Sequence, residues 1–414
     1  MKISRRKFIS RTAILCTAGS SLIASATVSP HLVNVVELGA DPIGINDSAN
    51  AIQNAINQIS KTGGTVYFPA GIYRISKTIE WINPSNQRAS GILFLGDGTH
   101  STILKSECKT GPLFRIRGTP IKGPVETNFF WGGGIQQLTF DGSRGGHQNH
   151  DGIEIMGWWY GEISQVRILN FSRHGIRAIT DLTVNPSPDF SASILAIKAT
   201  WMERCGGWGF IDDGGVQCSP GWTWTQCMFV FCGAGGAFVQ SSSHAFVKCS
   251  FSACGWVDEH SKPSALGYGL FFDGALTSSS RQWVEGCEFD TNYAAHIGVR
   301  FASSSSFINN RFIFNDRYHA GHLCPPIGVE IGAGDAKSAV RSVEFRQSFF
   351  RLDTPGKATG FQITNATYVR DISIVNSIYS DNTLGKVSFS RYKGFEAKGS
   401  RSINNYVIED ATQN

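Results

Sequence analysis

The chain has 414 residues, of which 41% are hydrophobic and 17% charged, as is ordinary for a globular protein. Forty-six glycines and 28 phenylalanines against only four methionines favour turn-rich β structure over a helical bundle. No apolar run reaches the roughly 18 residues of a membrane-spanning helix, and the spread of aromatic residues excludes extensive disorder.

The formal charge of +5 originates in the first 26 residues. Lys2, Arg5, Arg6, Lys7 and Arg11 lie there without any Asp or Glu, so that 32 basic and 32 acidic residues remain in the rest of the chain. A neutral body has no global field that would attract a polyanion. We therefore expect no nucleic-acid partner, and we expect any acidic substrate to be recognised locally.

Residues 1–26 have the layout of a cleaved signal peptide: a basic start, a modestly apolar middle and the small residues Ala24-Ser25-Ala26. Ser4-Arg5-Arg6-Lys7-Phe8-Ile9 is similar to the twin-arginine export motif, which serves proteins that fold before export. An ordinary secretory signal is the alternative. Leu15-Cys16 lacks the small residue that precedes a lipoprotein cysteine. We expect a periplasmic or secreted protein without a membrane anchor.

The first elements of the mature chain are predicted between residues 33 and 75. Residues 33–38 indicate a strand and 39–42 a turn. Asp47 or Ser48 can cap a helix whose apolar face holds Ile52, Ala55, Ile56 and Ile59. Residues 63–73 predict a strand that is interrupted by a proline and a glycine.

Residues 35–75 resemble the opening of the pectate-lyase-like superfamily, to which polygalacturonases and pectate lyases are related. The matching residues are Gly39-Ala40, Asp47, Ala51-Ile52-Gln53-Asn54-Ala55-Ile56, Gly63-Gly64, Val66, Pro69, Gly71 and Tyr73. Asp41-Pro42-Ile43-Gly44 departs from the usual Gly-Asp-Gly. The resemblance implies an all-β fold, a single-stranded right-handed parallel β-helix, with an N-terminal helix that caps the open end of the solenoid.

The rest of the chain repeats at irregular intervals, from 22 residues, enough for one coil, to 38. Strand anchors are predicted at Phe140, Phe171, Met202, Phe229, Phe251, Phe289, Phe312, Phe349 and Ile378. Glycine-led strands follow most anchors, beginning at Gly152, Gly175, Gly209, Gly236, Gly269, Gly328 and Gly360. We expect one parallel β-helix domain over residues 31–408, including the cap at 33–75.

Cysteines and amides recur at fixed distances from the anchors. Two residues before them lie Cys227, Cys249, Cys287, Asn310, Gln347 and Asn376, and three residues after them lie Cys205, Cys232, Cys254, Asn292, Asn315 and Asp381. Coils stack about 4.8 Å apart, so these residues should form columns. Side chains in register point alongside one another, which favours free thiols over the alternative of disulfides.

The outward positions of the glycine-led strands are the predicted functional face. The second residue after each glycine is Glu154, Arg177, Ile211, Phe238, Phe271, Glu330 or Gln362. Two residues further on lie Met156, Ile179, Asp213, Gln240 and Asp273, and Arg300 follows a similar strand. Such a mixture suits a sugar-binding groove, although a solvated sheet face is the alternative at each single position.

Asn149-His150-Asp151-Gly152-Ile153-Glu154-Ile155 is similar to the polygalacturonase motif Asn-Thr-Asp-Gly-Ile-Asp-Ile, whose first Asp belongs to the catalytic acidic group. An inverting hydrolase needs two carboxyl groups across the scissile bond. The next coil carries Ser172-Arg173-His174-Gly175 instead of the family's acidic pair. Glu154 and Asp213 are the remaining candidates for a second carboxylate, so hydrolysis is an alternative function.

A basic pair in place of an acidic one favours a polysaccharide lyase, which neutralises a uronate carboxylate and removes its C5 proton. We predict Asp151, Arg173, His174 and Arg177 as catalytic residues: an arginine neutralises, His174 takes the proton and Asp151 orients the imidazole. A purely structural role of His174 in the turn is equally open. Predicted substrate-binding residues are Glu154, Trp208, Asp213, Asp273, His296 and Arg300.

A second cluster on the longest insertions is the alternative active site. It comprises Asp258-Glu259-His260, Tyr293, His296, Asp316-Arg317-Tyr318-His319 and His322. Trp158-Trp159-Tyr160 could stack on sugar rings, or could pack against a neighbouring loop.

The sequence thus predicts an exported enzyme that cleaves a uronic-acid-containing polysaccharide by β-elimination. A polygalacturonase-like hydrolase and a non-catalytic polysaccharide-binding or assembly protein are the alternatives. No cofactor is expected to be required and no metal-binding residue is assigned, although calcium is possible, with Asp213 and Asp273 as oxygen ligands. Monomer and trimer are both open.

Overall fold

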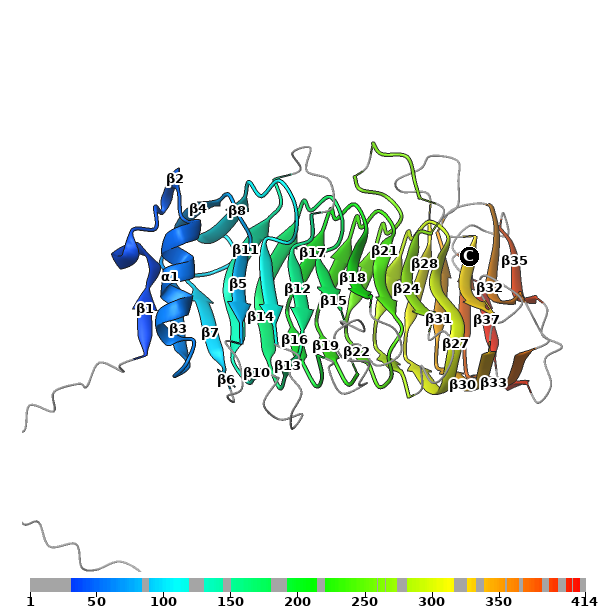
Figure 1. Ribbon diagram of the computed structural model, residues 1–414. Helices are drawn as coiled ribbons and strands as arrows, with labels where there is room; N and C mark the ends of the chain where they lie inside the picture. The colour runs from blue at the N-terminus through cyan, green and yellow to red at the C-terminus, as the bar shows by residue number, and fades with distance from the viewer. Residues whose placement is uncertain are drawn as a thin grey trace, which may run out of the picture. The chain divides into compact units, whose positions relative to one another are not determined.

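The computed structural model describes residues 31–83, 89–118, 130–143, 150–179, 192–213, 220–258, 260–264, 266–273, 281–315, 326–332, 339–353, 356–364, 368–381, 387–393, 400–403 and 405–409. The predicted signal peptide at 1–26 lies outside these ranges. Within them the chain forms a right-handed parallel β-helix, as predicted, whose coils follow one another from β1 to β37 (Figure 1). The boundaries 31–408 of the domain stay a prediction.

An N-terminal cap covers the first coil. It consists of β1 (Leu32–Asn34), the 3-10 helix η1 (Val35–Leu38) and α1 (Ala49–Ile59), so the predicted strand at 33–38 is mostly this short helix. The predicted apolar face of α1 is buried, and α1 packs against β3 and β5. Ser48 is the N-cap residue of α1, while the Asp47 carboxylate accepts a hydrogen bond from the backbone N–H of Ala49.

Each complete coil contributes to three parallel faces, here called A, B and C. Face A contains β5 (Ile79–Ile82), β9 (Phe114–Arg117), β12 (Ile153–Met156), β15 (Ile176–Ala178), β18 (Trp208–Asp212), β21 (Gly235–Val239), β24 (Tyr268–Asp273), the first part of β27 (Ala295–Ile308), β29 (Ile327–Ile331), β32 (Gly356–Ile363) and β35 (Val387–Lys393).

Face B contains β1, β3 (Gly64–Phe68), β7 (Ile92–Gly96), the first parts of β11 (Gly134–Asp141) and β14 (Glu162–Leu169), β16 (Ala196–Lys198), β19 (Thr223–Thr225), β22 (Ala245–Val247), β25 (Trp283–Glu285), the end of β27, β30 (Ala339–Arg346), β33 (Val369–Val375) and β36 (Arg401–Ile403).

Face C contains β2 (Ile43–Asp47), β4 (Gly71–Ile75), β8 (Thr102–Ser106), the ends of β11 and β14, β17 (Trp201–Glu203), β20 (Met228–Val230), β23 (Ser250–Ser252), β26 (Glu288–Asp290), β28 (Arg311–Phe314), β31 (Phe349–Leu352), β34 (Ile378–Asp381) and β37 (Tyr406–Glu409). A small separate sheet joins β6 (Ala89–Ser90), β10 (Phe130–Trp131) and β13 (Trp158–Trp159) at one corner.

The apolar core consists of stacked columns of side chains. The anchor column of face C is Phe140, Ile168, Met202, Phe229, Phe251, Phe289, Phe312, Phe350 and Tyr379. Six predicted anchors are confirmed, whereas Phe171, Phe349 and Ile378 are wrong. Phe350 is fully buried and Phe349 only partly, because neighbouring strand residues point to opposite sides of the sheet.

The predicted glycine-led strands also lie in one register on face A. A Cβ on Gly236 would come within 2.3 Å of the carbonyl oxygen of Gly269, so this column requires glycine where coils approach so closely. His296 occupies the same column between Gly269 and Gly328.

The seven described cysteines are all buried and free, as predicted. Cys227, Cys249 and Cys287 stack in one column, in which the backbone N–H of Cys249 donates to Sγ of Cys287 at 3.4 Å. The column continues through Asn310 to Ser348 and Ser377, one residue away from the predicted Gln347 and Asn376.

Among the described residues, no helix has the length and apolar character needed to cross a membrane.

Candidate functional site

A ladder of alternating charges runs across the outer surface of face A. Glu80, Arg115, Glu154 and Arg177 occupy equivalent positions on β5, β9, β12 and β15. Their neighbours along each strand, such as Ile79 and Trp81 on β5, are fully buried, so the alternation of the strand turns these four side chains outward. Parallel pairing then places each arginine beside a carboxylate of the adjoining coil.

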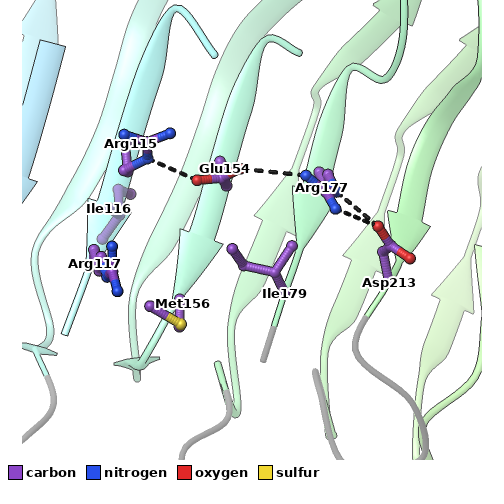
Figure 2. Close-up of a pocket in the computed structure, with 8 residues that line it drawn as sticks. All are labelled: Arg115, Ile116, Arg117, Glu154, Met156, Arg177, Ile179 and Asp213. Carbon is purple, nitrogen blue, oxygen red and sulfur yellow. Dashed lines mark hydrogen bonds and ion pairs between the residues drawn. The ribbon is translucent and has the colours of Figure 1, made fainter. Parts of the chain in front are cut away.

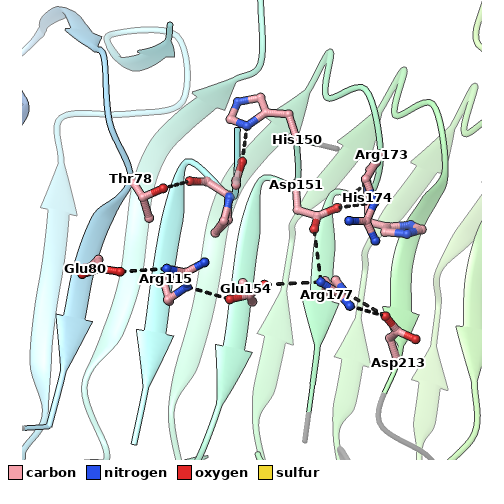
Figure 3. A network of polar contacts seen from close by, with 12 residues as sticks. Thr78, Glu80, Arg115, His150, Asp151, Glu154, Arg173, His174, Arg177 and Asp213 are labelled. Atoms are coloured by element: carbon pink, nitrogen blue, oxygen red, sulfur yellow. Dashed lines mark hydrogen bonds and ion pairs between the residues drawn. The ribbon is translucent and has the colours of Figure 1, made fainter. Parts of the chain in front are cut away.

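The ladder is continuous over four coils (Figure 3). Arg115 Nη1 lies 2.8 Å from Glu80 Oε1, and Arg115 Nε lies 2.7 Å from Glu154 Oε1. The other oxygen of Glu154 lies 3.4 Å from Arg177 Nη1. Arg177 also donates from Nε and Nη2 to Asp213 Oδ2, at 2.8 and 2.6 Å. Arg177 therefore connects the ladder to a carboxylate at the end of β18.

A pocket of about 320 Å³ opens over this ladder (Figure 2). Its lining contains three arginines and two carboxylates, which leaves one net positive charge. Met156 and Ile179 form an apolar side of the pocket. The lining residues are Arg115, Ile116, Arg117, Glu154, Met156, Arg177, Ile179 and Asp213. Guanidinium groups recognise carboxylates in planar, bidentate geometry, so the pocket suits an anionic ligand.

Asp151 lies behind the ladder, with 2% of its surface exposed. Its carboxylate accepts a hydrogen bond from the backbone N–H of His174 at 3.0 Å, and it lies 3.6 Å from Arg173 Nε and 3.8 Å from Arg177 Nη1. Burial raises the pKa of Asp151 to about 6, although the two arginines and the N–H oppose this shift. Asp151 is thus an internal partner of the arginines and not a residue of the pocket wall.

His174 does not have the partners that the sequence suggested. The backbone N–H of Trp208 donates to His174 Nδ1 at 3.0 Å, so a neutral imidazole carries its proton on Nε2. Burial first, and then Arg173 and Arg177, lower the pKa of His174 to about 3. The Asp151 carboxylate accepts its hydrogen bond from the backbone N–H of His174 and not from the imidazole ring. The predicted relay, in which Asp151 orients His174 as the base, is wrong in this arrangement because the Nδ1 lone pair is occupied.

Four predicted substrate-binding residues lie away from the pocket: Trp208, Asp273, His296 and Arg300. His296 is fully buried among Phe289, Phe312 and Phe314, where no polysaccharide can reach it, and burial lowers its pKa to about 3. Asp273 is 7% exposed and pairs with Arg300, 3.2 Å away.

Trp208 is 5% exposed, so its ring offers no face to a sugar. A Cβ on Gly235 would lie 2.0 Å from Cζ3 of Trp208, which shows that the indole rests on the glycine of the next coil. On the outer side it packs against Phe238 and Phe271.

The alternative cluster is only partly described. Glu259, Asp316-Arg317-Tyr318-His319 and His322 lie outside the described residues. The backbone N–H of His260 donates to Asp258 within a local turn. Tyr293 packs against Trp256.

The glycine-led pattern missed Glu80, Arg115 and Arg117, because β5 and β9 have no glycine at that position. Strict alternation was the available signal: in Phe114-Arg115-Ile116-Arg117 the apolar side chains are buried and the arginines point outward.

Calcium has no fitting site at the two predicted carboxylates. The register of β18, β21 and β24 puts Asp213 and Asp273 two coils apart, roughly 10 Å, and each is paired with an arginine. Within the described ranges no group of three or more His, Cys, Asp or Glu residues could hold a metal ion. These residues therefore do not fit the six to eight oxygen ligands that calcium takes, about 2.4 Å away.

Two family models match the chain. One, described as rhamnogalacturonase A/epimerase, pectate lyase-like, matches residues 32–256. The other, a right handed beta helix region, matches residues 210–411.

Related sequences include two proteins of Azotobacter vinelandii. Mannuronan C5-epimerase AlgE1 is 34% identical over 139 residues, which are 32% of this chain and 9% of that protein. Alginate lyase 7 is 33% identical over 136 residues, which are 31% of this chain and 14% of that protein. The matched segment thus spans a small part of either relative.

Solved structures share the fold at low sequence identity. The Streptococcus pneumoniae surface adhesin PfbA has a TM-score of 0.56 and 10% identity over 91% of this chain and 99% of its own. The Dettilon tailspike protein has a TM-score of 0.55 and 13% identity over 88% of this chain and 68% of its own.

Proposed function

The chain belongs to the rhamnogalacturonase A/epimerase, pectate lyase-like family, and from this premise we propose that it removes the C5 proton of a uronic acid within an anionic polysaccharide. The observation that carries the proposal is the position of Arg177, which contacts Glu154 and Asp213 in a pocket of net positive charge. The names of the relatives, mannuronan C5-epimerase and alginate lyase, support the same substrate class.

The first step is an exchange of partners at Arg177. A uronate carboxylate that binds the guanidinium takes the place of a protein carboxylate, and its neutralisation makes the C5–H bond more acidic. Asp213 is the carboxylate most readily released, because its side chain is 41% exposed whereas that of Glu154 is 10% exposed. The Asp213 carboxylate that is released then lies next to the bound uronate.

Asp213 then takes the C5 proton. In elimination, the electron pair left at C5 forms the C4=C5 double bond, the C4–O4 bond breaks and O4 takes up a proton. In epimerisation, a proton returns to the opposite face of C5 and the glycosidic bond stays intact. In either case water supplies the proton that O4 or C5 takes up, and the proton on Asp213 passes to solvent. Asp151 holds Arg173 and Arg177 in place. No step runs through calcium.

The test is turnover of mannuronan, alginate and polygalacturonate by the purified protein in D₂O. Ultraviolet absorbance of an unsaturated uronate identifies elimination, and deuterium at C5 without chain cleavage identifies epimerisation. New reducing ends without either signal would instead establish hydrolysis.

Asp213→Asn should lower kcat by about 100-fold or more while the polymer still binds. Asp353→Asn is the matched control, because Asp353 pairs with Arg351 on face C at 2.7 Å. A variant Asp213→Asn with full turnover would contradict the role of Asp213, and no turnover of any uronate by the unmodified protein would contradict the proposed reaction.

A non-catalytic polysaccharide-binding function is the second candidate. The observation in its favour is that both carboxylates of the pocket already have arginine partners, which is the arrangement of a stable surface. Binding of a polyuronate without any of the three chemical signals would identify it.

We further propose that residues 1–26 direct export, which would place the protein where such polymers occur. N-terminal sequencing of the protein from a periplasmic fraction tests this, with cleavage after Ala26 as the expected result.

A further inference from the structure

One corner of the coils, where the chain leaves the small sheet and enters face B, repeats a left-handed backbone conformation. Successive coils place Gly132, Tyr160, Ile194, Gly221 and Ser243 there, with φ values of 70, 56, 56, 76 and 64°. Backbone hydrogen bonds connect each coil to the next, as from Tyr160 N–H to the carbonyl oxygen of Ser193 at 3.2 Å. These residues are therefore structural equivalents.

Tyr160 and Ile194 are the wrong residue types for this conformation. Left-handed backbone favours glycine and tolerates small polar residues, and a β-branched residue there is a clear outlier. Glycine stands on both sides of the pair, at Gly132 and Gly221. The coil geometry thus costs conformational strain at these two positions, as it does at other turn residues of the solenoid such as Phe231 and Thr291. What distinguishes this corner is the exposure of its two apolar side chains.

Burial of the two side chains does not offset this backbone strain. Tyr160 is 55% exposed and Ile194 is 46% exposed. Tyr160 lies on the ring of Trp131, with centroids 5.6 Å apart and planes 18° from parallel. Trp131, Tyr160 and Ile194 together form an apolar patch that we call the corner platform. Its neighbour Trp158, for which sugar stacking and packing against a neighbouring loop were both open, is fully buried.

The corner platform is continuous with the arginine-lined pocket. Met156 and Ile179 line that pocket (Figure 2). Trp131 and Trp159 pack against the same Met156. A ligand over Arg117 and Met156 would therefore extend toward the aromatic rings as it leaves the pocket.

We infer that the corner platform is a subsite that stacks on a sugar ring of the same polysaccharide whose uronate occupies the pocket, an inference that rests on the proposed function. The apolar face of a pyranose ring packs on aromatic side chains, and the neighbouring arginines match the charge of a polyuronate. A protein partner would need a buried area of about 1,000 Å², which a patch of three side chains between two glycines does not offer.

Tyr160→Gly tests the inference, because glycine removes the ring and suits the backbone. We expect Kd for oligomannuronate, or KM for mannuronan, to rise about three- to tenfold, with a smaller change in kcat and no fall in melting temperature. Ile194→Gly should act in the same direction. Ser243→Gly, at the same corner two coils beyond Ile194, is the matched control and should change neither binding nor stability.

The following results would overturn the subsite. Unchanged binding in Tyr160→Gly would show that the ring contacts no sugar, and a lower melting temperature with unchanged binding in Ile194→Gly would make the patch a packing feature. Self-association that Tyr160→Gly abolishes, measured by sedimentation, would identify a second copy of the chain as the occupant instead. An unmodified protein that binds no polyuronate would overturn the proposed function together with this subsite, whereas normal turnover with unaffected variants would overturn the subsite alone.

Discussion

The outer column of face A changes character halfway along. Glu80, Arg115, Glu154 and Arg177 give way to Ile211, Phe238 and Phe271 on the next three coils, in unbroken register. Parallel stacking brings each side chain beside its equivalent on the next coil, about 4.8 Å away. Side chains of alternating charge can pair at that spacing, and aromatic rings can stack at it. The same backbone geometry therefore supports two different kinds of side-chain contact in the two halves.

The two halves differ in what water can reach. The charged half borders a pocket, and its arginines hold carboxylates of 10 to 41% exposure. In the aromatic half, Phe238 and Phe271 stack with centroids 5.6 Å apart, and Phe271 is 8% exposed. The aromatic half is in effect a second core on the outside of the sheet, so we assign the proposed chemistry to the charged half and a stabilising role to the aromatic half.

Trp208→Ala is the strongest test of that division. Trp208 packs beneath Phe238 and Phe271, and its loss should lower the free energy of unfolding by about 3–5 kcal/mol, measured by urea denaturation. Its backbone N–H still bonds His174, so polyuronate binding should stay the same.

Trp201→Ala, at 37% exposure on face C, is the control and should cost much less. Lost binding with full stability in Trp208→Ala would instead restore the sugar-binding role that the sequence suggested.

Asp151→Asn tests whether the buried Asp151 carboxylate, which lies behind the charged half, lowers the stability of the folded protein. The pKa of Asp151 is about 6 in the folded protein against 3.8 for the ordinary group. The folded state therefore binds more protons between these values, and stability falls as pH rises from about 4 to 6. Asparagine can still accept the N–H of His174 and has no charge to bury.

The variant should consequently gain stability relative to the unmodified protein as the pH rises, by an amount on the order of 3 kcal/mol at pH 7. Urea denaturation across a pH series measures this difference. If the difference is flat with pH, or if Asp151→Asn is less stable at pH 7, then Arg173 and Arg177 outweigh burial and the carboxylate is ionised at little cost.

The division into two halves also shows what the sequence could predict. The period of the glycine-led strands predicted the register, so Glu154, Arg177, Ile211 and Phe238 do lie in one column. The register can be predicted because the same pattern of a glycine followed by an apolar strand recurs from coil to coil. The register slipped by one residue at Phe349, where Phe349-Phe350 offers two equivalent apolar anchors.

Contacts between coils were less predictable. Nothing in the sequence around His174 indicates that the backbone of Trp208, a full coil later, occupies its Nδ1. The burial of His296 could not be read from its neighbours either, since it replaces a glycine in a column that only the fold reveals. Such contacts depend on loop lengths, which the repeat does not encode.

Of the variants proposed, Glu80→Gln should have the smallest effect on the free energy of unfolding. Glu154→Gln is the variant to compare with it. Both carboxylates bind Arg115, at 2.8 and 2.7 Å, but their side chains are 39% and 10% exposed. Water screens the outer pair, so Glu80→Gln should cost about 0.5 kcal/mol or less and lose that effect in high salt. Glu154→Gln removes a shielded partner from two arginines and should cost about 1–3 kcal/mol with little salt dependence. Equal losses of unfolding free energy in the two variants would mean that solvent exposure does not determine the strength of these ion pairs. The ion pairs beside the pocket would then not differ from the exposed ones, which would contradict the assignment of the proposed reaction to the pocket.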